Sequence, residues 1–127
     1  TDIHFLRMEQ LYPFPVDALA QELAPYKHCD LVWCQEEPRN MGPWAFVSTF
    51  IEEVAEDIGF EKPRPRYAGR PSAASPATGS HKRHVEEQAS LLDDALTLGK
   101  KRMGRIESRK VQTEARARIG NKGEAAE

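Results

Sequence analysis

Short apolar runs alternate with amphipathic stretches along the first 98 residues of the chain. Residues 3–8 (IHFLRM) are rich in strand formers and are followed by a pair of prolines, which predicts a strand. A helix is expected to begin near Asp17 and to end at Pro25, because apolar residues recur at helical spacing between them. Residues 31–34 (LVWC) form a continuous apolar run, typical of a strand that is covered on both faces.

The pattern continues with two longer helices and one short strand. Residues 43–59 keep an apolar face, carry a proline in the first turn and end in a glycine, as amphipathic helices do. A loop over residues 63–76 is expected to contain a short strand at 66–68. Residues 81–98 then predict a helix with an apolar face at nearly every fourth position. The residues of that face are Val85, Ala89, Leu92 and Leu96.

Strands and helices alternate in this order, which predicts an α/β layered domain. Strands that are joined by helices should be parallel, with right-handed connections. Three strands make a sheet thinner than the usual about four to six. We therefore expect the chain to be part of a domain, and it is expected to begin in a strand with no element before it.

Net charge divides the chain at residue 99. Residues 1–99 hold 9 basic and 16 acidic side chains, and residues 100–127 hold 9 basic and 4 acidic ones, so the net charges are −7 and +5. We expect 1–99 to be a partial domain and 100–127 to be a basic tail, disordered or a frayed helix. The tail has no aromatic residue on which bases could stack, so a nucleic-acid partner is not favoured.

The composition also argues against membrane and secreted classes. No run approaches the roughly 20 apolar residues that span a bilayer, and the first residues lack the pattern of a signal peptide. Cys29 and Cys34 form no Cys-x-x-Cys motif. Cys34 lies in an apolar run and is expected to be a buried thiol rather than a redox or metal-binding one. These features favour a reducing, cytoplasmic-type compartment.

Two carboxylates occupy a position where α/β proteins bind ligands. Glu36 and Glu37 directly follow the run 31–34, at the carboxyl end of a predicted strand. The favoured interpretation is that Glu37 and Asn40 satisfy backbone groups in a turn and cap the next helix. The chain contains no phosphate-binding loop, dinucleotide fingerprint or nucleophile elbow.

A basic stretch rich in hydroxyl groups runs from Arg64 to Arg83, into the start of the last predicted helix. Helix N-termini and arginines both attract phosphate groups, so an anionic ligand is one interpretation. A solvated loop whose arginines pair with the acidic body explains the same pattern equally well. His81, His84 and Glu87 share a helix face, but the segment offers no further ligand, so a metal site is not expected.

Four stretches, taken together, resemble one family. They are residues 6–15 (LRMEQLYPFP), 32–47 (VWCQEEPRNMGPWAFV), 66–79 (RYAGRPSAASPATG) and 81–96 (HKRHVEEQASLLDDAL). They are similar, in this order, to the C-terminal end of the thiamine-diphosphate-dependent first component of the 2-oxoglutarate dehydrogenase complex. The resemblance covers about residues 2–98. It implies a three-layer α/β domain of the transketolase C-terminal type, with a mostly parallel sheet, truncated at its N-terminal side.

The resemblance also implies what the whole subunit does. The family decarboxylates 2-oxoglutarate in the tricarboxylic acid cycle with thiamine diphosphate and Mg²⁺. It then passes the succinyl group to lipoyl groups of the dihydrolipoyl succinyltransferase component. The implied partners are the remaining domains of the subunit, a homodimer partner and that succinyltransferase. The implied compartment is the bacterial cytoplasm or, in a eukaryote, the mitochondrial matrix.

For this chain alone the resemblance implies a supporting role. The family's cofactor, metal and activating glutamate belong to segments that do not occur here, so no catalytic, cofactor-binding or metal-binding residue is expected in this chain, and it should be inactive alone. Some family members carry a regulatory site for a nucleotide or an acyl-CoA in this region. The candidate effector-binding residues are Arg66, Arg70, Ser75 and His84. The alternative is a stand-alone module that binds an anion or a nucleotide.

Overall fold

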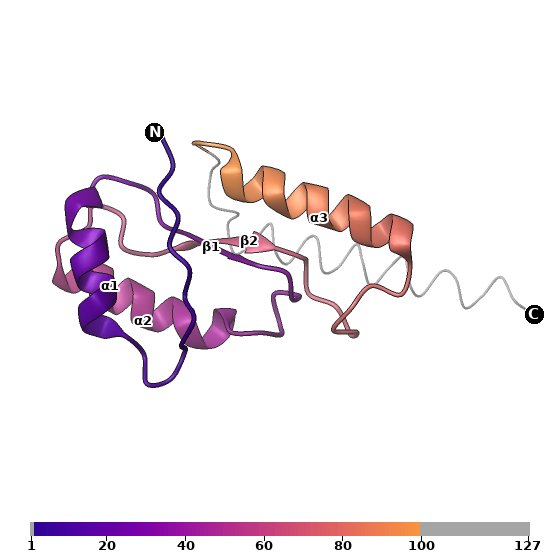
Figure 1. The fold of residues 1–127 in the computed structure, drawn as a ribbon, viewed down its shortest axis with the longest axis horizontal. Coiled ribbons are helices and arrows are strands. Elements are labelled where there is room, and N and C mark those ends of the chain that lie inside the picture. Colours follow the sequence, from indigo (N-terminus) through magenta and orange to yellow (C-terminus); the bar gives the residue numbers. More distant parts are fainter. Residues whose placement is uncertain (1, 100–127) are drawn as a thin grey trace, which may run out of the picture.

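Two short parallel strands lie between helices in the computed structural model, which describes residues 2–99 (Figure 1). The elements are α1 (Val16–Leu23), the 3-10 helix η1 (Ala24–Tyr26), β1 (Val32–Gln35), α2 (Trp44–Asp57), β2 (Arg66–Gly69) and α3 (His81–Leu96). In the strand pair, Val32 lies opposite Arg66 and Gln35 lies opposite Gly69. Figure 1 shows α3 on one side of the pair and α1 and α2 on the other. The predicted α/β alternation and the parallel pairing are confirmed.

Helices α1 and α2 form the main apolar core. Asp17 in the first turn of α1 complements the helix dipole, and Pro25 lies two residues after the end of the helix, within η1. Gly59, with φ of +80°, follows the last turn of α2, where a residue with a side chain would be strained. The buried core residues are Leu23, Ala55 and Phe60, with Leu19, Tyr26, Leu31 and Ile58 packed around them. The predicted amphipathic helix over 43–59 is confirmed, because Val47, Ile51, Val54 and Ala55 of α2 are buried.

Strand β1 is less covered than its apolar sequence predicts. Val32 is 38% exposed and the thiol of Cys34 is exposed, so the predictions of a doubly covered strand and of a buried Cys34 are wrong. The reason is that α3 packs more against β2 than against β1. The thiol is still partly shielded from solvent. That shielding, together with the carboxylates of Asp94 and Glu36, raises the pKa of Cys34.

The predicted strand at residues 3–8 does not form. This segment has no regular secondary structure, and most of its side chains are exposed, with Phe5 at 74%. A strand needs a neighbouring strand to satisfy its backbone groups, and the sheet in the described part of the chain contains only β1 and β2. The segment instead makes side-chain contacts, such as the stacking of His4 on Tyr26 at 4.6 Å between ring centroids.

The last two predicted elements form, with one important difference. The short strand predicted at 66–68 is β2, and the helix predicted over 81–98 is α3, which ends at Leu96. The predicted apolar face of that helix does not pack on the sheet: Val85, Leu92 and Leu96 are exposed, while Leu91 is buried. The prediction for residues 100–127 lies outside the described residues.

Candidate functional site

The turn after β1 is organised by one buried side chain, Gln35, which is 6% exposed. Its Oε1 accepts hydrogen bonds from the indole Nε1 of Trp33 at 2.9 Å and from the backbone N of Trp44 at 3.0 Å. Its Nε2 donates to the backbone carbonyls of Glu37, Pro38 and Met41, at 3.2, 3.3 and 2.9 Å. Gln35 therefore satisfies the start of α2 and holds the turn closed.

Asn40 ties this turn to the loop that follows β2. Its Nδ2 donates to the carbonyl of Ala73 at 2.9 Å, and its Oδ1 accepts from the backbone N of Ala73 at 3.0 Å. The prediction that Asn40 satisfies backbone groups is confirmed, although these groups belong to the loop 70–79 rather than to its own turn. The helix cap that was assigned to Glu37 and Asn40 comes from Gln35 instead.

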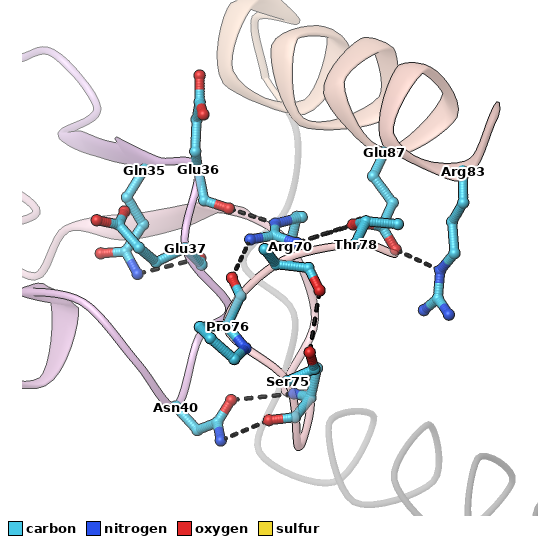
Figure 2. A network of polar contacts seen from close by, with 12 residues as sticks. Gln35, Glu36, Glu37, Asn40, Arg70, Ser75, Pro76, Thr78, Arg83 and Glu87 are labelled. Carbon is cyan, nitrogen blue, oxygen red and sulfur yellow. Dashed lines mark hydrogen bonds and ion pairs between the residues drawn. The ribbon is translucent and has the colours of Figure 1, made fainter. Parts of the chain in front are cut away.

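Arg70 is the centre of a second polar network at the carboxyl end of β2 (Figure 2). Its guanidinium donates to the backbone carbonyl of Glu36 and, at 2.6 Å, to that of Pro76. It also donates to Oγ1 of Thr78 at 2.9 Å, and the Thr78 hydroxyl donates onward to Glu87 at 2.6 Å. One side chain thus connects the turn after β1, the loop after β2 and helix α3.

Glu87 supplies the negative charge of this network. Its carboxylate pairs with Arg70 at 3.6 Å and with Arg83, one helical turn earlier, at 2.7 Å. The hydrogen bond from Thr78 is the main reason why the pKa of Glu87 is lowered, with Arg83 and Arg70 adding to the effect. The side chains of Arg70 and Glu87 are only 14% and 18% exposed. The network is therefore an ion-paired and hydrogen-bonded link between the sheet and α3.

The four candidate effector-binding residues do not converge on one point. Arg70 and Ser75 lie on the same loop, where the hydroxyl of Ser75 donates to the carbonyl of Ala77 at 3.0 Å. His84 is exposed in the first turns of α3. Arg66 contacts the far end of that helix: it donates to the carbonyl of Asp94 at 2.8 Å and pairs with the Asp94 carboxylate at 3.3 Å.

A pocket of about 180 Å³ lies between the end of β2 and α3. Its lining residues are Gly69, Arg70, Pro71, Glu87, Ser90, Leu91 and Asp94. Pockets that enclose a small organic ligand usually measure roughly 300 Å³ or more. Two of the three charged residues in this lining are acidic, so its electrostatics do not favour a phosphate group.

Arg39 and Tyr67 belong to the site, although the sequence patterns did not single them out. The guanidinium of Arg39 lies over the rings of Trp44 and Tyr67, at 5.9 and 5.4 Å from their centroids. The Tyr67 hydroxyl donates toward the carbonyls of Glu37 and Arg70, at 3.0 and 2.9 Å. Burial raises the pKa of Tyr67 to about 12. A polar residue directly after an apolar strand, as at Gln35, was the one available sequence signal for this cluster.

The described part of the chain offers neither a metal-binding cluster nor a membrane-spanning helix. Residues 2–99 contain no cluster of three His, Cys, Asp or Glu side chains arranged to hold a metal ion. Among His81, His84 and Glu87, which share a helix face, the Glu87 carboxylate already accepts hydrogen bonds from Thr78 and Arg83. Among the same residues, no helix has the length and apolar character needed to cross a bilayer.

Comparison with known proteins identifies similar sequences. A sequence model of the family described as 2-oxoglutarate dehydrogenase C-terminal matches residues 1–96. Relatives include the 2-oxoglutarate dehydrogenase E1 components of Brucella anthropi, Brucella ovis and Brucella melitensis biotype 2, each 53% identical over 95 residues. These residues are 75% of this chain and 10% of each relative. The chain thus spans about a tenth of the length of the curated relatives it matches.

Proposed function

The chain belongs to the 2-oxoglutarate dehydrogenase C-terminal family, and from this premise we propose that it acts as the C-terminal part of an E1 subunit. The whole subunit would decarboxylate 2-oxoglutarate and transfer the succinyl group to lipoyl groups of a succinyltransferase component, in the tricarboxylic acid cycle. The observation that carries the proposal is the 53% identity over 95 residues to E1 components about ten times as long as the matched segment. A dimeric subunit in the cytoplasm, or in a mitochondrial matrix, is part of the same proposal.

Thiamine diphosphate and Mg²⁺ would supply the electron sink for decarboxylation in the whole subunit. The described residues do not fit these groups. A diphosphate would meet the carboxylates of Glu87 and Asp94 in the pocket, and residues 2–99 offer no cluster of metal-binding side chains. We therefore assign no step of that reaction to this chain.

The contribution of the chain would be to pack against the rest of the subunit. Two features support this role. Arg66 of β2 and Arg70, which directly follows β2, are already paired with carboxylates of α3, so these polar groups hold the chain together internally. Within residues 2–99 the sheet has two strands, and β1 exposes part of its apolar surface, as a segment of a larger sheet would. The whole domain would then have the three-layer transketolase C-terminal fold.

A replacement experiment tests the proposal. A chimeric subunit carries residues 2–96 of this chain in place of the matching segment of the Brucella anthropi E1 component. It is assayed with 2-oxoglutarate, thiamine diphosphate, Mg²⁺ and an artificial electron acceptor. We expect turnover by the chimera and none by the isolated chain. The Brucella subunit without its matched segment is the control and should lose activity. A folded but inactive chimera, or turnover by the isolated chain, would contradict the proposal.

We also propose that a nucleotide or an acyl-CoA regulates the subunit by binding near the start of α3, where His84 is exposed and the loop with Arg70 and Ser75 precedes the helix. Arg66 pairs with Asp94 at the far end of α3 and would take no direct part. The support is the common loop of Arg70 and Ser75, next to the start of α3, where the N-cap Ser80 makes no side-chain capping bond. Titration calorimetry with AMP and acetyl-CoA tests this, with His84→Ala as the variant because His84 is exposed and its removal spares the fold. No heat at millimolar ligand from a folded chimera would remove the proposal.

A further inference from the structure

Helix α3 turns a continuous apolar stripe toward solvent. Val85 is 51% exposed, Leu92 46% and Leu96 43%, and Ala89 between them is exposed as well. The four residues are spaced by 4, 3 and 4 positions, so they lie along one side of the helix. This spacing is the one that packs against another helix, with each side chain entering a gap of the facing surface. We call this surface the outer stripe of α3.

The helix cannot bury the outer stripe by turning about its own axis. Its opposite side holds Leu91, which is 4% exposed, and the carboxylates of Glu87 and Asp94. Glu87 pairs with Arg70 and Asp94 pairs with Arg66, and both arginines are largely buried by these contacts. Rotation of α3 would leave two largely buried guanidinium groups without their carboxylate partners, which is strongly destabilising. The outer stripe must therefore be covered from outside the described fold.

The size of the outer stripe decides between a second copy of the chain and the rest of the subunit. Its exposed side chains present roughly 250 Å² of apolar surface, well below the about 800 Å² per partner that a stable dimer of separate chains buries. A segment of the same polypeptide needs no such area, because its tether supplies a high effective concentration. The E1 relatives are about ten times as long as the matched region, and the family match extends to residue 96, the last residue of the stripe.

We propose that the outer stripe of α3 is the docking surface for a helix in the remainder of the same E1 subunit. This inference rests on the proposed function and names the surface through which the chain would support that subunit. The docked helix would present its own apolar residues at intervals of three and four positions, packed against Leu92 at the centre of the stripe.

Cysteine labelling tests the docking surface. Leu92→Cys is introduced into the isolated chain and into the chimeric subunit, and the rate of alkylation is followed on its proteolytic peptide by mass spectrometry. Glu86→Cys is the matched control, because Glu86 lies on the same helix, is exposed and stands outside the stripe. We expect Leu92→Cys to react about tenfold more slowly in the subunit than in the isolated chain. The rate for Glu86→Cys should change much less.

A second variant provides an independent measurement. Leu92→Asp should leave the melting temperature of the isolated chain nearly unchanged, because the side chain is half exposed, but should lower that of the chimeric subunit. Equal labelling of Leu92→Cys in chain and subunit would overturn the docking surface even if the chimera is active. Concentration-dependent protection in the isolated chain would assign the stripe to a second copy and overturn it too. Protection in an inactive chimera would support docking while contradicting the proposed function.

Discussion

Replacement of Gln35 offers a direct test of how the site is built. Gln35→Met preserves the length of the side chain but removes both its acceptor and its donor. The indole N–H of Trp33 and the backbone N–H of Trp44 then lose their acceptor, and three carbonyls of the turn lose their donor. A buried polar group without a partner costs about 1–3 kcal/mol. Because solvent reaches part of this turn, we expect a loss of about 3 kcal/mol in the free energy of unfolding, or roughly 15 °C in melting temperature.

Gln35→Glu separates the acceptor from the donor. The carboxylate still accepts from Trp33 and Trp44, but it faces carbonyl oxygens where Nε2 donated. Burial and these oxygens disfavour the charged form, so the pKa of the introduced carboxyl is raised above its ordinary value of about 4.3. A group whose pKa is raised by folding stabilises the fold when it is protonated. The penalty of Gln35→Glu should therefore be large at pH 7 and should shrink toward pH 5.

Urea unfolding at pH 7 and pH 5, followed by the fluorescence of Trp33 and Trp44, measures both effects. Gln21→Met and Gln21→Glu are matched controls, because Gln21 is exposed on α1; they should change the free energy of unfolding by less than about 0.5 kcal/mol. The explanation is refuted if Gln35→Met is as mild as its control. It is also refuted if the penalty of Gln35→Glu does not depend on pH.

Three further variants test individual contacts. Glu87→Gln should reduce acid sensitivity. Folding lowers the pKa of Glu87, so the wild type should lose more stability than the variant as pH falls below about 4.5, measured by thermal unfolding. Equal acid sensitivity would contradict the pairing. Tyr67→Phe should remove an alkaline loss of stability. Because folding raises the pKa of Tyr67 to about 12, the wild type should lose about 1–2 kcal/mol between pH 10 and 12 in urea titrations, and an identical loss in the variant would refute this. Gly69→Ala should destabilise more than Gly59→Ala in the same assay. A Cβ at Gly69 would lie 2.6 Å from the backbone oxygen of Gln35. A Cβ at Gly59 would meet open space, and only the positive φ of that residue would be unfavourable. The reverse order of destabilisation would contradict the close approach at Gly69.

Elements whose burial is decided locally could be predicted from the sequence. Helix α2 buries Val47, Ile51 and Val54 on one face, and that periodicity is visible in the sequence without knowledge of the partner. Residues 3–8 have strand-forming side chains, but a strand also needs a partner at its edge, and composition carries no such information. Strand β1 formed as expected because β2 provides that edge.

The site was predicted less well because pairing over long sequence distances is not periodic. Arg66 and Arg70 were identified as cations at a promising position. Whether they face a ligand or a carboxylate depends on how α3 is rotated, and the periodicity of its apolar face does not show which side packs on the sheet. The polar side of α3 faces the sheet because Glu87 and Asp94 pair with the two arginines there. The sequence does not reveal the role of Gln35, because a single amide side chain after an apolar run rarely indicates the centre of a hydrogen-bond network.

The rotation of α3 connects the polar network to the role of the chain. A helix that buries its apolar side against its own fold is stabilised by that packing and needs no further partner. Here the ion pairs of Arg66 and Arg70 fix the helix with its polar side inward, and Val85, Leu92 and Leu96 remain outside. Exposed stripes of this kind favour association, so natural sequences keep them where a partner covers them. The polar network therefore does more than join α3 to the sheet, because it also determines which surface the chain offers to its surroundings.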